Sequence, residues 1–380
     1  MFVERLECSN CRAPHSHKEI QTVCKNCGST LLVKYNLVEM KDKLKKEDLL
    51  GREGTLWRYF EFLPIKYRRD IITLGEGFTP ILKASNLGFR SLWIKDESLN
   101  PTGTFKARGM AVAVSKARIL GIKDIVLPSA GNAAAALSFY CAKAGIRAHV
   151  FMPEDSPDVT KRECIVSGAD VHLVKGTIAD AGKVAKAKAK EQGWFDMSTL
   201  KEPYRLEGKK TMGLEIAEYF NWELPDVVIY PTGGGTGLIG IWKAFQELKE
   251  LGWISGEMPK MISVQASGCA PVVKAFKEDK ESVEEWKNPK TIAAGLKVPK
   301  PFAGKLILKV LRDSNGFAIS VTDEEIFNAI KDLARYEGIY ACPEGAATYA
   351  GLKKLVNDGI LSMDDRILLM NTGSGLKYLL

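Results

Sequence analysis

Short apolar runs alternate with longer segments of mixed polarity along most of the chain. The runs predict β-strands, because each is too short for a buried helix and is bounded by turn-forming residues. Strands are expected at 79–85, 91–97, 123–129, 147–153, 170–175, 225–231, 260–267 and 365–373. The intervening segments predict helices at 104–120, 132–144, 158–167, 178–192 and after Gly237.

Strands that alternate with helices are typical of parallel sheets covered by helices on both faces. The pattern therefore predicts an α/β fold with doubly wound open sheets. Residues 36–70 differ from this pattern and predict a charged helix followed by a connecting loop. The segment 287–301, rich in Lys and Pro, is expected to be a mobile surface loop.

The composition is that of a globular enzyme, with 380 residues, 46% hydrophobic and 26% charged. A net charge of +8 suits small anionic ligands. No dense basic block favours nucleic acid, because 41–48 (KDKLKKED) mixes acids with its lysines. The N-terminus lacks a signal-peptide pattern, and no apolar run is long enough to span a membrane, so a soluble cytoplasmic protein is expected.

Four of the eight cysteines lie near the N-terminus with the spacing C-x2-C-x12-C-x2-C. Each C-x2-C pair can place two thiolates on one side of a turn, and two such turns supply four tetrahedral ligands. The spacing predicts a zinc-ribbon module over 1–35, with Cys8, Cys11, Cys24 and Cys27 as ligands of a structural zinc ion. The alternatives are free thiols or two disulfides, and a ribbon of this kind can also bind nucleic acid.

A glycine-rich loop follows the strand at 225–231 and leads into a helix, in the stretch YPTGGGTGLIG (230–240). Glycines at a helix start expose backbone N–H groups, which suit a phosphate group. The loop is neither a Walker A sequence nor a clean G-x-G-x-x-G. The alternative is an ordinary tight turn.

Two further loops join this picture. Ser129 to Ala133 follows a strand and opens a helix of alanines, so a carboxylate can approach its free N–H groups. Lys106 stands at the start of another helix, behind a Pro-Thr-Gly turn and beside Phe105. The helix dipole and the aromatic ring both disfavour an ammonium charge there, which is the condition for a lysine that forms a Schiff base.

A last strand-end loop, NTGSGLK (371–377), carries Thr372, whose hydroxyl can bond a ring nitrogen. A reactive lysine, a phosphate cradle, an asparagine and this hydroxyl together are what pyridoxal 5′-phosphate requires. A neutral hydroxyl at the ring nitrogen favours elimination and replacement over transamination.

These motifs resemble those of the fold-type II pyridoxal-phosphate enzymes and, within that group, of the threonine synthases. The resemblance runs from about Leu74 to the end of the chain. It is carried by TLGEGFTPI (73–81), NPTGTFKARG (100–109), EPYRLEGKKTMGLEIAE (202–218) and NTGSGLK (371–377). Some members of the family also carry an N-terminal extension similar to a zinc ribbon.

The resemblance implies conversion of O-phosphohomoserine and water to L-threonine and phosphate by a homodimer. It implies a large cofactor-binding domain from 36–97 and 198–380, and a smaller mobile domain over 98–197. The implied cofactor contacts are Lys106, Asn132, Gly233, Gly234, Gly235, Thr236, Gly237 and Thr372. The implied substrate contacts are Ser129, Gly131, Asn132 and Ala133 for the carboxylate and Arg205 for the phosphate.

Some positions depart from the family pattern. Ala107 stands where threonine synthases usually have Asp, and GGGTG (233–237) replaces their commoner Gly-Asn-x-Gly-Asn. This loop is closer to that of threonine/serine ammonia-lyases. A threonine/serine ammonia-lyase or another β-replacement synthase is therefore an alternative with the same cofactor. A zinc-ribbon nucleic-acid-binding protein on a catalytically inactive scaffold is the alternative of another class.

Overall fold

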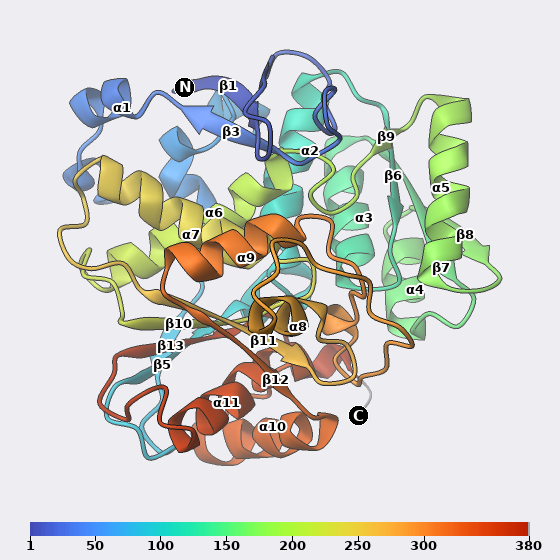
Figure 1. Ribbon diagram of the computed structural model, residues 1–380. Coiled ribbons are helices and arrows are strands. Elements are labelled where there is room, and N and C mark those ends of the chain that lie inside the picture. Colours follow the sequence, from blue (N-terminus) through green and yellow to red (C-terminus); the bar gives the residue numbers. More distant parts are fainter. Residues whose placement is uncertain (379–380) are drawn as a thin grey trace. The chain divides into compact units, whose positions relative to one another are not determined.

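The computed structural model of the chain describes residues 1–378 (Figure 1). These residues group into two compact units, each built from several segments of the chain. The first unit contains Met1–Gly77, Asn100–Thr102 and Lys106–Thr211. The second contains Phe78–Leu99, Gly103–Phe105 and the described part of Met212–Leu380.

The N-terminal cysteine module (residues 1–35) forms a three-stranded antiparallel sheet in the order β2-β1-β3. Its strands are β1 (Val3–Cys8), β2 (Pro14–His15) and β3 (Leu31–Tyr35). Leu6, Leu31 and Val33 are buried at its centre. This small core is supplemented by two turns of the C-x2-C type, one after β1 and one before β3.

The first unit also contains a four-stranded parallel sheet in the order β8-β7-β6-β9. Its strands are β6 (Asp124–Pro128), β7 (Arg147–Pro153), β8 (Asp170–Val174) and β9 (Phe195–Asp196). Successive side chains of a strand point to opposite faces. Phe151 accordingly packs against α5 (Ile178–Gln192), whereas Val150 and Met152 pack toward α3 (Asn132–Ala144) and α4 (Asp158–Val166).

The remaining helices of this unit precede the sheet in the chain. They are α1 (Leu37–Lys43), the 3-10 helices η1 (Lys46–Leu49), η2 (Leu56–Phe62) and η3 (Arg68–Asp70), and α2 (Lys106–Ile119). The division between the units falls inside α6 (Tyr204–Tyr219), after Thr211. Two glycines let α2 and α6 approach closely, because a side chain at Gly208 would collide with the carbonyl group of Arg108 and one at Gly109 with the carbonyl oxygen of Arg205.

The second unit is built on a six-stranded sheet in the order β12-β11-β10-β13-β5-β4. Its strands are β4 (Ile81–Lys83), β5 (Leu92–Asp96), β10 (Val227–Pro231), β11 (Lys260–Ala266), β12 (Phe317–Val321) and β13 (Ile367–Asn371). All neighbours are parallel except β4, which pairs with β5 in the antiparallel sense. The central strands β10 and β13 are buried along their whole length, as expected for strands covered on both faces.

Helices cover both faces of this sheet. They are α7 (Thr236–Glu250), α8 (Pro271–Lys277), α9 (Gly304–Asp313), α10 (Asp323–Glu337) and α11 (Pro343–Asn357). In Figure 1, α10 and α11 lie below the strands and α7 and α9 above them. The short 3-10 helices that involve this unit are η4 (Glu97–Leu99), η5 (Pro101–Gly103), η6 (Ala294–Leu296) and η7 (Gly375–Lys377).

The predicted α/β class is confirmed, and the larger sheet is mixed where a purely parallel one was expected. The antiparallel edge strand β4 is short, with two exposed residues among its three. The segment 287–301 is anchored at several points, because Ala293 and Leu296 are buried and Thr291 donates to Asp323 over 2.6 Å. Among the described residues, no helix combines the length and apolar character needed to cross a membrane.

Candidate active site

The chain just before Lys106 is fixed to the end of the last strand of the second unit. The N–H of Phe105 donates to the carbonyl oxygen of Thr372 over 3.1 Å, and the N–H of Ser374 donates to that of Gly103 over 2.9 Å. Thr104 and Gly373 form an isolated β-bridge between these bonds. The turn Gly103–Phe105, which we call the lysine turn, is thereby held beside Thr372.

Lys106 is the first residue of α2 and is half-buried. The N-terminus of a helix carries a partial positive charge, which opposes the charged form of an amine placed there. The next residues, from Ala107 to Ala117, are all buried, so the helix is fixed along its length. The lysine therefore extends from a rigid base at the N-terminus of a helix.

The glycine loop (residues 232–237) follows β10 and begins α7. Gly235 precedes the helix with φ of 78°, a left-handed conformation that favours glycine, and no side chain caps the first amides. A side chain at Gly237 would collide with the hydroxyl of Tyr230, and one at Gly233 with the carbonyl oxygen of Gly295. Glycine is thus required by close approach at two positions, and the loop presents backbone N–H groups at a helix N-terminus.

The hydroxyl of Thr372 lies in a buried polar group at the end of β13. The Sγ of Cys342 is 3.6 Å from Thr372 Oγ1 and accepts from the N–H of Gly345 over 3.3 Å. Burial raises the pKa of the Cys342 thiol, so this sulfur is a neutral neighbour. Thr372 itself is 5% exposed.

Glu344 lies next to this group at the start of α11. Its Oε1 accepts from the N–H of Gly295 over 2.6 Å, and its Oε2 makes no hydrogen bond within residues 1–378. The residue is buried, so Oε2 is a hydrogen-bond acceptor that has no donor among the described residues. Gly295 also borders Gly233 of the glycine loop, which places Glu344 close to that loop.

The loop Ser129–Ala133 lies at the carboxyl end of β6 in the first unit. Gly131 precedes α3 in an extended conformation and no side chain caps the helix. The N–H of Gly131 donates to Ser129 Oγ over 3.4 Å, and a side chain built on Gly131 meets no atom within 4 Å among the described residues. The helix start is therefore open on this side and can receive a carboxylate.

Arg205 is the second residue of α6 and is buried. Its Nη1 donates to the carbonyl oxygen of Met197 over 2.7 Å, while its Nε has no hydrogen-bond partner in the described part of the chain. Its backbone carbonyl lies 2.9 Å from where a side chain on Gly109 would begin, one turn along α2 from Lys106.

Glu202 caps the helix that carries Arg205. Its carboxylate accepts the N–H of Tyr204 over 2.7 Å and that of Arg205 over 3.1 Å. Burial raises the pKa of Glu202 to about 7, and the charge of Arg205 opposes this shift. Burial also lowers the pKa of Arg205 from its ordinary value.

The four N-terminal cysteines come together in the first unit. Cys8 and Cys27 have their sulfur atoms 3.4 Å apart, Cys11 and Cys24 3.6 Å apart, and all four lie within 4.8 Å of one another. None forms a disulfide. Backbone N–H groups of Asn10, Cys11 and Asn26 donate to Sγ atoms of Cys8 and Cys24 over 3.4 Å each.

The cysteine module packs against the segment that leads into α6. Thr30 Oγ1 donates to the carbonyl oxygen of Leu200 over 3.0 Å, and the Tyr35 hydroxyl donates to Glu207 over 2.7 Å. Both contacts are buried. The module therefore supports the helix turn that carries Arg205.

The second unit alone brings together the glycine loop, Thr372 and the lysine turn, whereas the first unit carries Lys106, Ser129–Ala133 and Arg205. Sequence reasoning missed the contribution of Tyr230 and Cys342 to this arrangement. The position of Cys342 could have been predicted in part, because a proline such as Pro343 commonly occupies the first position of a helix and the residue before it is then the N-cap.

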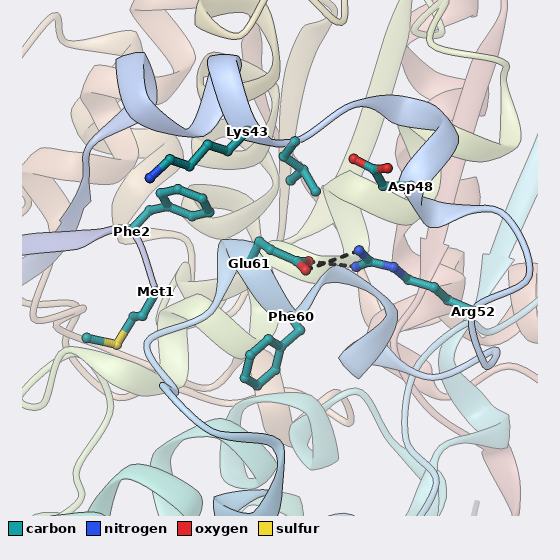
Figure 2. Close-up of a pocket in the computed structure, with 8 residues that line it drawn as sticks. Met1, Phe2, Lys43, Asp48, Arg52, Phe60 and Glu61 are labelled. Atoms are coloured by element: carbon teal, nitrogen blue, oxygen red, sulfur yellow. Dashed lines mark hydrogen bonds and ion pairs between the residues drawn. The ribbon is translucent and has the colours of Figure 1, made fainter.

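A separate surface pocket of about 540 Å³ lies in the first unit (Figure 2). It is lined by Met1, Phe2, Lys43, Leu44, Asp48, Arg52, Phe60 and Glu61. Arg52 donates to both oxygens of Glu61, over 2.6 and 3.1 Å, so the two charges neutralise each other. No predicted site residue lines this pocket.

Known proteins resemble the chain over most of its length. A family model described as "Pyridoxal-phosphate dependent enzyme" matches residues 72–373. A threonine synthase of Methanocaldococcus jannaschii is 40% identical over 375 residues, which cover 97% of this chain and 92% of that protein. A threonine synthase of Methanosarcina acetivorans is 38% identical, covering 98% of this chain and 92% of that protein. The structure of maize serine racemase matches with a TM-score of 0.68 at 23% identity, covering 78% of this chain and 88% of that one.

Proposed function

The chain belongs to the family of pyridoxal-phosphate dependent enzymes, and we propose that it is a threonine synthase. The reaction converts O-phosphohomoserine and water to L-threonine and phosphate. The observation that carries the proposal is the 40% identity to a threonine synthase across 97% of the chain. The predictions of a pyridoxal-phosphate enzyme and of this activity agree with that observation.

The residues present fit pyridoxal phosphate. The glycine loop offers uncapped N–H groups, and side chains at Gly233 or Gly237 would have no room. The buried Thr372 hydroxyl supplies a neutral partner for a ring nitrogen. We propose that Gly233, Gly234, Gly235, Thr236 and Gly237 hold the phosphate, that Thr372 and Asn132 contact the ring, and that Lys106 forms the covalent link.

Bound there, pyridoxal phosphate supplies an electron sink that stabilises negative charge at carbon atoms of the substrate. Lys106 would take the proton from Cα and then one from Cβ, because its amine is favoured in the neutral form at the start of α2. The phosphate leaves from Cγ, water adds at Cβ, and one proton each returns to Cγ and to Cα, which gives threonine.

We propose that two elements of the first unit, the start of α3 and Arg205, orient the substrate. The open start of α3 from Ser129 to Ala133 would bind the carboxylate, since no side chain caps these amides. Arg205 would bind the phosphate through the guanidinium group whose Nε lacks a partner among the described residues.

We further propose that the cysteine module binds one structural zinc ion. Four thiolates around zinc at about 2.3 Å have sulfur–sulfur distances of about 3.8 Å, close to the 3.4 and 3.6 Å of the nearest pairs. Backbone N–H groups that donate to Cys8 and Cys24 would stabilise their negative charge. The ion would fix the module, which in turn supports α6.

The activity is tested with purified protein supplied with pyridoxal phosphate and O-phosphohomoserine. The proposal expects inorganic phosphate and threonine in equal amounts. Formation of 2-oxobutanoate from threonine without phosphate release from O-phosphohomoserine would instead indicate an ammonia-lyase. K106A serves as the inactive control, because any phosphate it releases comes from contaminants.

A further inference from the structure

A second cluster of metal-ligating side chains lies in the four-stranded sheet, away from the residues discussed above. His149 of β7 pairs in register with Asp170 of β8, and Phe151 pairs with His172. The side chains of His149, Asp170 and His172, which we call the histidine cluster, therefore lie on one face. They belong to the amino-terminal part of their strands, whereas Ser129–Ala133 follows the carboxyl end of β6.

Three ligand atoms converge in this cluster. Asp170 Oδ2 is hydrogen-bonded to His149 Nδ1 over 3.1 Å and lies 2.8 Å from His172 Nε2, and the three atoms are all within 4.8 Å of one another. A bound ion would replace the hydrogen bond between His149 and Asp170. Ligands bound to one ion at about 2.0–2.2 Å lie about 3.3–3.6 Å apart in a tetrahedral site and about 2.8–3.1 Å apart, when adjacent, in an octahedral site, so the two distances are those of octahedral neighbours. We propose that the histidine cluster binds a divalent transition-metal ion, with His149, Asp170 and His172 as ligands.

The orientation of His172 is that of a ligand. Its Nε2 is buried and makes no hydrogen bond within residues 1–378, although Asp170 Oδ2 is only 2.8 Å away. The contact between His172 Nε2 and Asp170 Oδ2 is therefore short, but it lacks the geometry of a hydrogen bond. Two ligands of a common ion have this relationship, because both direct lone pairs at a third point.

His149 has the outer support that metal-binding histidines have. Its second nitrogen, Nε2, lies 3.0 Å from Asp124 Oδ1, and Asp124 is held by two bonds from Arg147, over 2.6 and 2.7 Å. A carboxylate behind a ligating imidazole fixes its tautomer and orients the ring. Trp194 stacks on His149 with ring centres 3.6 Å apart, which prevents rotation of the ring.

The donor set defines the class of ion. Two imidazole nitrogens with one carboxylate suit zinc, nickel, cobalt or iron, whereas magnesium and calcium prefer oxygen ligands alone. The side chain of Asp170 is 57% exposed, so an ion can enter from this side and keep water as its further ligands. Since β8 is an edge strand, the ion would also join β8 to β7.

The test uses the full chain carrying pyridoxal phosphate and one equivalent of zinc, so that the cysteine module is occupied first. Isothermal titration with NiCl2 should then show binding of one further ion. H172F keeps the stacking on Phe151 and removes one ligand, and it should weaken nickel binding by at least about ten-fold. D124N, which alters the support of His149 and also the exposed ion pair of Asp124 with Arg147, should weaken nickel binding by about ten- to a hundred-fold.

The matched control is D155N, since Asp155 is an exposed acid beyond the opposite end of β7. It should bind nickel as the native chain does. D170N is measured beside H172F, so that the conclusion does not depend on the folding of one variant. The proposal is overturned if the native chain takes up no second ion at millimolar nickel, or if H172F and D170N both bind as tightly as D155N.

Discussion

The N–H of Phe105 donates a hydrogen bond to the carbonyl oxygen of Thr372 over 3.1 Å. The residue before the proposed cofactor lysine is thus joined to the residue whose hydroxyl is the proposed partner of the ring nitrogen. Thr104 and Gly373 continue the pairing through a β-bridge. Two motifs that are far apart in the sequence are therefore fixed together by the backbone, independently of their side chains.

Replacement of Lys106 by Ala should abolish the covalent attachment of the cofactor and lower kcat by roughly 10³-fold or more, because a proton-transfer group is lost. Borohydride treatment followed by mass spectrometry should find a modified lysine at position 106 in the native protein. K123A is the matched control, since Lys123 is an exposed lysine just before β6. Retention of the adduct in K106A would contradict the assignment.

Replacement of Thr372 by Val should weaken cofactor binding and lower kcat by about ten- to a hundred-fold, since one buried hydrogen bond to the ring is lost without a change of shape. T372S keeps the hydroxyl and should stay near the native values. Fluorescence titration of the protein with pyridoxal phosphate measures the affinity. Equal affinities for the Val and Ser variants would exclude a role of this hydroxyl.

Two glycines should respond to alanine in different ways. G237A places a methyl group against the Tyr230 hydroxyl, so it should destabilise the protein by about 1–3 kcal/mol and weaken cofactor binding. G131A projects into open space, so its stability should be native while the KM for O-phosphohomoserine rises. Thermal unfolding and steady-state kinetics of both variants separate the two effects. A stable, cofactor-tight G237A would contradict the packing argument.

Removal of zinc should act on substrate binding through α6. A chelator that strips the cysteine module should raise the KM for O-phosphohomoserine, because the contacts Thr30–Leu200 and Tyr35–Glu207 support the turn that carries Arg205. The cofactor absorbance should persist, since these two contacts reach neither Lys106 nor the glycine loop. Re-addition of zinc should restore the native KM. Loss of cofactor on chelation, with the KM for O-phosphohomoserine unchanged, would argue against an effect of the cysteine module on substrate binding through α6.

The sequence predicted most strands of the two larger sheets and the loops at their ends, because these follow from local patterns, but it missed β9 and β12. The strand expected at 147–153 is β7 (Arg147–Pro153), and the helix expected at 132–144 is α3 (Asn132–Ala144). The antiparallel edge strand β4 was not distinguished from parallel ones, since strand direction depends on distant pairing. Tyr230 and Cys342 were missed for the same reason, as their positions near Gly237 and Thr372 arise only in the folded chain.

The titration of Glu202 predicts a pH dependence that the matched variant E202Q should lack. The pKa of Glu202 is raised from 4.5 to about 7 by burial, so the folded protein favours its protonated form. Protonation of Glu202 therefore contributes to the free energy of unfolding, and this contribution is fully present below pH 4.5. It is lost as the pH rises through about 7, and the free energy of unfolding falls by an amount on the order of 3 kcal/mol. E202Q keeps an acceptor for the N–H groups of Tyr204 and Arg205, and its stability should not fall across this window on account of position 202.

The same ionisation should affect substrate binding. Above pH 7 the Glu202 carboxylate carries a charge beside Arg205 and competes with an anionic ligand for it, so the KM for O-phosphohomoserine should rise in the native protein relative to E202Q. The ratio of the two KM values between pH 6 and pH 8.5 is the decisive measurement, because ionisation of the substrate and cofactor cancels in it. A ratio that does not change with pH would show that Glu202 acts only as the cap of α6.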